Sequence, residues 1–268
     1  MAFSSVKGFQ LKADGKSDRG RIVAALMNFL EPLEYVHAFY EGGAAAFGRI
    51  DEWSDLDLYA IVDDDKVEQT FRVVEEALNS VHQIDMKYPV LQPPWPGVIQ
   101  AFYRLKNTSR YLLVDFAVLT QRSGEKFLEP NIHGDNVFYF NKSSRIKPPT
   151  LDKQKFKDTM YERLERLSAR FDMFNIFVQK EINRGNWLEA LDLYYNVTLA
   201  SLVEALRARY SSFHYDFKMR YIHYELPAEI VVRLQNLYFV KDKEELQSKY
   251  HEANKWFLTA ISEVSTTH

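Results

Sequence analysis

A pair of glycines followed closely by two aspartates constrains this chain more than any other feature of its sequence. Gly42 and Gly43 are separated from Asp55 by 11 residues, and Asp57 follows after a single leucine. The apolar run from Leu56 to Val62 predicts a buried strand. Alternate residues of a strand point to the same face, so the two carboxylates are expected about 6.5 Å apart. Neighbouring carboxylates repel each other unless a cation lies between them.

This arrangement suits a hard dication that carries phosphates. Mg²⁺ prefers carboxylate oxygens and is commonly bound together with nucleotide phosphates. Glycines at a turn leave backbone N–H groups accessible to a phosphate, because no Cβ blocks the approach. The alternative is a solvent-exposed hairpin in which acidic residues happen to alternate with leucines. Asp is depleted in strands, which favours a binding site over that alternative.

A third carboxylate lies in a second apolar run. Residues Tyr111 to Leu119 predict a strand with Asp115 at its centre. A carboxylate in the middle of a buried strand costs free energy unless a partner binds it. A structural salt bridge is the other explanation for Asp115. On the first explanation, Asp115 binds a ligand.

The Gly-Gly turn, the spacer, the segment Ser54–Leu58 and the third acid together resemble the signature of the DNA polymerase β-type nucleotidyltransferase superfamily. The resemblance implies that a substrate hydroxyl attacks the α-phosphate of a nucleoside triphosphate, such as ATP, and that pyrophosphate leaves. It also implies two Mg²⁺ ions. One is held by all three acids, and the other by Asp55 and Asp57 together with the triphosphate.

The same resemblance implies which residues hold the β- and γ-phosphates. Gly42, Gly43 and Ser54 are the expected phosphate ligands. Gly43 stands where many family members carry Ser, so the Ser54 hydroxyl is expected to replace the missing one. Arg49, between the turn and the strand, is a further candidate, and a solvated loop charge explains its position equally well.

The charge distribution argues against a nucleic acid partner. The 34 basic and 37 acidic residues give a net charge of −3 and are well mixed. Nucleic-acid-binding proteins usually carry a basic block or stripe, which this sequence lacks. The absence of cysteine excludes disulfides, thiolate zinc sites and cysteine nucleophiles. No segment has the apolar length of a signal peptide or a membrane span, so we expect a soluble, cytoplasmic protein without a membrane partner.

The first half of the chain predicts a small α/β unit. Ser17 is a candidate N-cap for a helix from Asp18 to Glu34, and a second helix is expected at Lys66–Ser80. Prolines predict an irregular loop from Tyr88 to Gly97. Strands are expected at Tyr35–Tyr40, Leu56–Val62, Val98–Leu105 and Tyr111–Leu119.

Beyond the prolines at positions 148 and 149, every segment predicts helix. Apolar residues recur at three- and four-residue spacing from Phe156 to Val178. A second helix is expected from Trp187 to Tyr210. Its apolar residues form one face, directed at the core, and Leu188 belongs to that face. Two further helices are expected after Pro227 and after Asp242. We therefore predict an α+β protein with a nucleotidyltransferase core, built on a small mixed sheet, at residues 1–148 and an all-helical bundle at residues 149–268.

This architecture resembles the small-molecule branch of the superfamily, whose best-known members are the aminoglycoside nucleotidyltransferases. The branch implies transfer of AMP from ATP to a hydroxyl of an aminoglycoside-like acceptor. It also implies a carboxylate that acts as a base for that hydroxyl. Asp192 is the first candidate, ahead of Glu189 and Asn196, because Glu189 is expected to be occupied in a capping box that begins at Asn186.

A cation from the helical half is expected to contact the nucleotide phosphates. Lys218 is the candidate, with Arg220 as its alternative, and both lie in an aromatic and basic stretch between two helices. A cation that faces a triphosphate gains charge-assisted hydrogen bonds. A helix-terminal cation on a wet surface explains either residue equally well.

Three other functions are compatible with the same sequence. Arg209 and His214 fit the Arg-x4-6-His spacing of a HEPN-type ribonuclease from two-part toxin–antitoxin systems, although Tyr210 stands where that family has a polar residue. Transfer of AMP onto a protein side chain is a related alternative. The third is a non-catalytic nucleotide-binding module, and the presence of all three acids counts against it.

Overall fold

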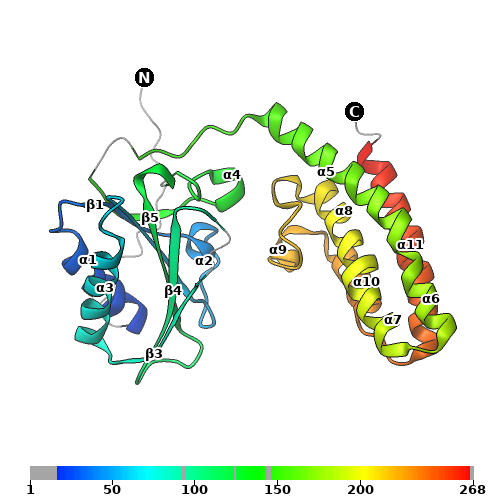
Figure 1. Ribbon diagram of the computed structural model, residues 1–268, viewed down its shortest axis with the longest axis horizontal. Helices are drawn as coiled ribbons and strands as arrows, with labels where there is room; N and C mark the ends of the chain where they lie inside the picture. The colour runs from blue at the N-terminus through cyan, green and yellow to red at the C-terminus, as the bar shows by residue number, and fades with distance from the viewer. Residues whose placement is uncertain (1–16, 92–94, 124, 143–145, 266–268) are drawn as a thin grey trace. The chain divides into compact units, whose positions relative to one another are not determined.

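The chain divides into two compact units, Met1–Thr150 and Leu151–His268. The computed structural model describes residues 17–91, 95–123, 125–142 and 146–265. The first unit combines a sheet with helices, and the described part of the second contains helices only (Figure 1). The predicted α+β fold class is therefore confirmed. Each unit is treated by itself below.

The first unit is built on a six-stranded mixed sheet with the strand order β3-β4-β5-β2-β1-β6. The neighbours β2 and β5 are parallel and lie at its centre, and every other neighbouring pair is antiparallel. The strands are β1 (Val36–Glu41), β2 (Leu56–Val62), β3 (Ile84–Pro89), β4 (Val98–Leu105), β5 (Leu113–Thr120) and β6 (Val137–Asn141).

Two helices, α1 (Asp18–Leu30) and α3 (Val67–Val81), pack against each other and against one face of the sheet (Figure 1). Ser17 caps α1 as predicted, because its Oγ accepts a hydrogen bond from the Gly20 N–H at 3.1 Å. The helix ends at Leu30 instead of Glu34: the Glu31 N–H still donates to the Met27 carbonyl oxygen, but Pro32 has no N–H to continue the ladder.

The side chains of β2 divide between the two faces of the sheet. Leu56 and Leu58 are fully buried in the apolar cluster under α1 and α3. Asp57, between them, therefore points to the opposite face. The remaining short helical segments of this unit are α2 (Gly43–Ala46), a 3-10 turn (Gln121–Ser123) and α4 (Pro130–His133).

Two edge strands were absent from the prediction. β3 ends inside the segment expected to be a loop from Tyr88 to Gly97, and most of its residues are exposed. It carries Asp and Lys and ends at a proline, features that are tolerated at a sheet edge and that hide a strand from a hydrophobicity pattern. β6 forms the opposite edge and pairs with β1.

The second unit is a set of helices around one apolar cluster. Both helices expected after Pro227 and Asp242 are present. The helices are α5 (Lys153–Phe174), α6 (Ile176–Arg184), α7 (Trp187–Leu193), a π-helical segment (Tyr194–Leu199), α8 (Ala200–Tyr210), a 3-10 turn (Ser212–His214), α9 (Ile222–Glu225), α10 (Ala228–Tyr238) and α11 (Lys243–Ser265). Across the described residues, none of the helices is long and apolar enough to cross a membrane.

Two details of the helical prediction were wrong. The stripe from Phe156 to Val178 is interrupted at Asn175, where α5 ends. The Asn175 side chain is buried and accepts a hydrogen bond from the Thr198 hydroxyl at 2.6 Å. Leu188, expected on the core face, is 81% exposed, because it lies in the first turn of α7 beyond the edge of the cluster.

Candidate functional site

The three predicted acids meet at one end of the two central strands. Asp57 on β2 and Asp115 on β5 are register partners in the parallel ladder. Neighbouring strands lie about 4.8 Å apart, so these two residues are side by side on the face that points away from α1 and α3. Asp55 comes directly before β2, and its Oδ1 accepts a hydrogen bond from the Leu113 N–H at the start of β5, at 3.3 Å.

Each carboxylate has a different environment. An oxygen of Asp115 accepts a hydrogen bond from the Gln100 side-chain amide on β4 at 2.6 Å. Asp55 as a residue is exposed, yet its carboxyl group lies close enough to the sheet for burial to raise its pKa. The hydrogen bond from Leu113 and the charge of Arg19 oppose that shift. Asp57 is half-buried.

The Gly42-Gly43 turn packs directly against Asp57. The Gly42 N–H donates a hydrogen bond to the backbone oxygen of Asp57 at 2.9 Å, so this N–H is occupied within the fold. Gly43 has φ of +51°, and a Cβ there would overlap the Asp57 carboxylate. It would also lie 2.9 Å from the Asp57 Cβ, so rotating the carboxylate away does not create enough room. This conformation therefore requires glycine at position 43.

Ser54 and Arg49 are engaged within the loop that leads to β2. The Ser54 hydroxyl donates to an Asp51 carboxylate oxygen at 2.7 Å and accepts from the Asp51 N–H at 2.9 Å. The Arg49 guanidinium lies over the Phe47 ring, 5.0 Å from its centroid. Both residues therefore shape the loop, and their predicted role as phosphate ligands stays a prediction.

Sequence reasoning missed a polar cluster beneath the Asp55 backbone. Arg19 of α1 donates to the Asp55 carbonyl oxygen at 2.8 Å and forms an ion pair with Glu41 at the end of β1. Tyr139 of β6 donates its hydroxyl proton to the other Glu41 oxygen. Glu41 is 1% exposed. The only signal in the sequence was a charged residue directly before the Gly-Gly turn, at the end of an apolar strand.

The acid set fits a hard dication by its chemistry. Carboxylate oxygens are the ligands that Mg²⁺ prefers, and Asp55, Asp57 and Asp115 occupy adjacent backbone positions. In their present rotamers, however, the described residues include no group of three or more His, Cys, Asp or Glu side chains arranged to hold a metal ion. The oxygens of Asp115 and Asp55 instead accept N–H groups, as expected for acids that repel each other.

The candidate base Asp192 lies on α7 in the second unit. Its Oδ1 accepts a hydrogen bond from the Asn196 side-chain amide at 2.8 Å, so the two residues share one exposed face of the helix, as the spacing predicts. The capping interaction expected for Asn186 is not formed. Its amide donates to Glu181 at 2.7 Å instead, so the reason given for ranking Glu189 below Asp192 was wrong.

Lys218 lies in the irregular segment between the 3-10 turn at Ser212–His214 and α9. Its side chain is exposed and its backbone has φ of +54°, while its carbonyl oxygen accepts a hydrogen bond from Arg207 Nε at 2.5 Å. Arg220, the alternative cation, lies over the rings of Phe217 and Tyr221. These contacts define the local conformation of the segment.

The residues of the ribonuclease-like spacing have separate partners. Arg209 pairs with Glu263 of α11. His214 is buried, and its Nδ1 lies 3.0 Å from a Glu225 oxygen. Glu225 also pairs with the fully buried Arg207. These contacts place Arg209 and His214 in two different ion-pair groups.

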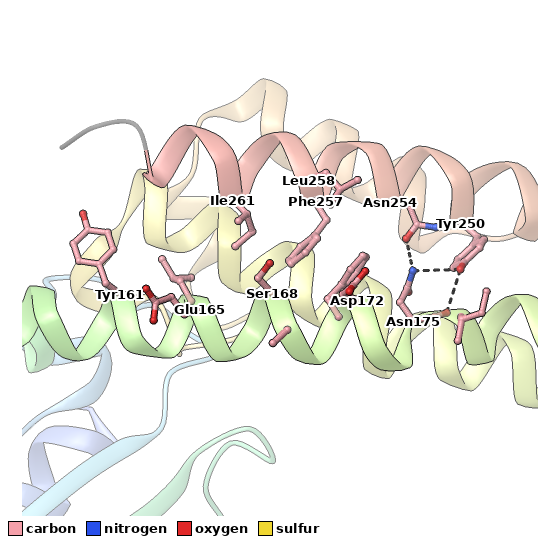
Figure 2. A pocket seen from close by; sticks show the side chains of 14 residues that line it. Tyr161, Glu165, Ser168, Asp172, Asn175, Tyr250, Asn254, Phe257, Leu258 and Ile261 are labelled. Atoms are coloured by element: carbon pink, nitrogen blue, oxygen red, sulfur yellow. Dashed lines mark hydrogen bonds between the residues drawn. The ribbon is translucent and has the colours of Figure 1, made fainter.

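A cavity of about 880 Å³ lies between α5 and α11 in the second unit (Figure 2). Glu165, Ser168 and Asp172 of α5 line one side, and Phe257 and other residues of α11 line the opposite side. None of the residues proposed from the sequence as catalytic or phosphate-binding lines this cavity. It is a feature of the helical unit separate from the acids of the sheet.

Comparison with known proteins gives matches among solved structures only, two of which are described here. No protein-family model and no curated protein sequence matches the chain. An aminoglycoside 6-adenyltransferase from Bacillus subtilis is 16% identical with a TM-score of 0.34, over 91% of this chain and 89% of that one. Spectinomycin adenyltransferase AAD(9) from Enterococcus faecialis, solved with ATP and spectinomycin, is 10% identical with a TM-score of 0.33, over 91% of this chain and 98% of that one.

Proposed function

We propose that the protein is a Mg²⁺-dependent nucleotidyltransferase that moves a nucleoside monophosphate, AMP from ATP, onto a hydroxyl of an aminoglycoside-like small molecule. One observation carries the proposal: Asp57 and Asp115 are register partners at the centre of the sheet, with Asp55 beside them and the Gly42-Gly43 turn packed against Asp57. Three adjacent carboxylates next to a glycine turn form a donor set suited to a dication that carries a triphosphate.

The proposed reaction is a displacement at the α-phosphorus. A bond forms between the acceptor oxygen and the α-phosphorus, and the bond to the bridging oxygen of the β-phosphate breaks, so that pyrophosphate leaves with the bonding electron pair. Asp55, Asp57 and Asp115 would hold Mg²⁺, which neutralises phosphate charge and acidifies the attacking hydroxyl. Asp192 is proposed to take the proton of that hydroxyl.

The remaining proposed roles concern binding of the triphosphate. Gly43 allows the backbone to approach a phosphate closely, since it has no Cβ. Ser54, Arg49 and Lys218 are proposed as further phosphate ligands. The bond from the Gly42 N–H to Asp57 ties the turn to β2, so we propose that Gly42 acts mainly by fixing the turn beside the acids.

The test is pyrophosphate release together with mass spectrometry of the acceptor. The protein is incubated with each of the four nucleoside triphosphates, with and without Mg²⁺, and with and without a panel of aminoglycosides. Release that requires both Mg²⁺ and an acceptor, with a nucleoside monophosphate attached to the acceptor, supports the proposal. Nucleotide binding without release with any acceptor would contradict transfer to a small molecule and favour a binding module or a protein acceptor.

A further inference from the structure

The carboxylate of Glu41 is buried on the helix side of the sheet, beneath the start of β2. At 1% exposure it is among the most buried charged groups of the first unit. Arg19 pairs with one of its oxygens and the Tyr139 hydroxyl donates to the other. Burial raises the pKa of Tyr139 to about 12, so this hydroxyl is a protonated donor at neutral pH. Both oxygens of Glu41 are therefore occupied by donors from two different elements, α1 and β6.

Arg19 connects this buried carboxylate to the candidate site. While one guanidinium nitrogen pairs with Glu41, another donates to the Asp55 carbonyl oxygen at 2.8 Å. Burial lowers the pKa of the Arg19 guanidinium, and the negative charges of Asp57 and Asp55 oppose that shift. The guanidinium is therefore close enough to both acids to interact with their charges. Its hydrogen bond goes to the Asp55 carbonyl oxygen, so the Asp55 carboxylate can bind other groups.

The hydrogen bond to Asp55 fixes the backbone at the point where the loop becomes a strand. The direction of a side chain on a strand is set by its backbone, and a small rotation at Asp55 would turn both Asp55 and Asp57. A planar guanidinium can hold a carboxylate and a carbonyl in one rigid geometry, which an ammonium cannot do. A buried ion pair by itself is weak evidence for stability, because an apolar replacement is often as stable. The hydrogen bond from Arg19 to the Asp55 carbonyl oxygen instead indicates that this ion pair positions the Asp55 backbone.

We propose that Arg19, held by Glu41 while Tyr139 holds Glu41, is a positioning residue that sets the orientation of the Asp55 and Asp57 carboxylates. The inference rests on the proposed function only where it concerns catalysis, namely the effect of Arg19 on kcat. Its structural consequence, the ordering of residues 51–58, is independent of any activity. Both consequences are measurable on the full chain.

The test compares Arg19→Lys with Arg21→Lys. Arg21 lies on the same helix and pairs with Asp18, but its side chain is 46% exposed and it makes no contact with Asp55 among the described residues. Both variants keep the positive charge, so a difference between them does not come from a loss of charge. Amide hydrogen exchange is followed by mass spectrometry over peptides that cover residues 51–58, together with kcat and the KM for the nucleoside triphosphate.

We expect Arg19→Lys to speed exchange in residues 51–58 by about tenfold, equivalent to about 1.4 kcal/mol of local opening free energy. We expect kcat to fall at least tenfold with the KM changed less than about twofold, since an interaction that orients groups for the transition state acts on kcat. Arg21→Lys is expected to leave both readouts unchanged. Equal exchange and equal kcat in the two lysine variants would overturn the proposal.

A second variant applies if Arg19→Lys lowers the stability of the whole unit. Tyr139→Phe removes a single hydrogen bond from Glu41 and should speed exchange in residues 51–58 by about threefold, with no change for Tyr111→Phe at an exposed position. The absence of any difference between these two variants would also overturn the proposal. If the wild-type protein releases no pyrophosphate with any acceptor, the proposed function fails, and the exchange measurement still decides whether Arg19 orders the acids.

Discussion

Asp57 and Asp115 are register partners on the only parallel pair among the described strands of the sheet. In a parallel pair, corresponding ends of the strands lie at the same edge, so one acid from each strand meets there with Asp55 beside them. Two neighbouring carboxylates are unfavourable without a compensating charge. Arg19 binds the Asp55 backbone and Gln100 binds the Asp115 carboxylate, and this arrangement supports the cationic ligand that we propose.

Replacing Gly43 with alanine should abolish transfer through a steric effect on Asp57. The added Cβ overlaps the Asp57 side chain, and φ of +51° is unfavourable for alanine by about 1 kcal/mol. Gly48→Ala is a matched control, because Gly48 has φ of +63° and no atom lies within 4 Å of the added Cβ. We expect both variants to lose stability through their positive φ, Gly43→Ala to lose more in urea unfolding because of the overlap, and only Gly43→Ala to lose turnover by at least about 100-fold. Equal turnover in the two variants would contradict the packing of Gly43 against Asp57.

Replacing Asp115 with asparagine tests whether this residue serves a ligand or only the fold. The side-chain oxygen of asparagine can still accept the hydrogen bond from Gln100, so the free energy of unfolding should change by less than about 1 kcal/mol. Turnover should fall at least about 1,000-fold, because the charge that holds a dication is lost. Asp85→Asn, at an exposed acid paired with Arg104, is the control and should retain turnover. A large loss of stability with turnover retained would favour a structural salt bridge.

Replacing Asp55 with asparagine should raise stability at neutral pH while it removes activity. Burial raises the pKa of Asp55, so the folded state favours the protonated form. Its contribution to stability is therefore fully present below the unfolded pKa and is lost as the pH rises through the folded pKa. The neutral asparagine avoids this loss, so Asp55→Asn should have the higher Tm at pH 7, and the difference should shrink as the pH falls below the ordinary Asp range. A lower Tm at pH 7 would show that the ionised carboxylate stabilises the fold.

In the second unit, Arg207 should be essential for stability. Its side chain is 0% exposed, pairs with Glu225 at 2.8 Å and donates to the Lys218 carbonyl oxygen. Arg207→Met leaves Glu225 with a buried charge and should cost about 3–5 kcal/mol in urea unfolding of the full chain. Arg166→Met removes an exposed pair with Glu162 and should cost less than about 0.5 kcal/mol. Similar costs for the two variants would contradict the role assigned to Arg207.

Much of the fold was predictable from the sequence because its central elements are apolar and periodic. The strands that carry Asp57 and Asp115 and the capped first helix were predicted close to their observed bounds. The edge strands β3 and β6 were missed, since edge strands need no continuous apolar pattern. The exposed position of Leu188 depends on where the apolar cluster ends, which is set by tertiary packing.

Only the part of the candidate site whose residues are close together in the sequence was predictable. The Gly-Gly turn and the two nearby acids form a local motif, whereas Arg19, Glu41 and Tyr139 come from three elements and meet only through the fold. The engagement of Ser54 with Asp51 and of Asn186 with Glu181 is also invisible in sequence, because each polar side chain has several partners within reach. Hydrogen-bond partners of polar residues therefore require coordinates.

The central claim is that the acids of the sheet are the transfer site, and Mg²⁺-dependent pyrophosphate release by Asp57→Asn tests it most directly. Asp64→Asn is the control, since Asp64 is exposed, lies beyond the end of β2 and pairs only with the exposed Arg122 among the ion pairs of the described residues. We expect release by Asp57→Asn to fall at least about 1,000-fold while Asp64→Asn stays within about twofold of the wild-type protein. Release by Asp57→Asn at the rate of the control would contradict the assignment of the site.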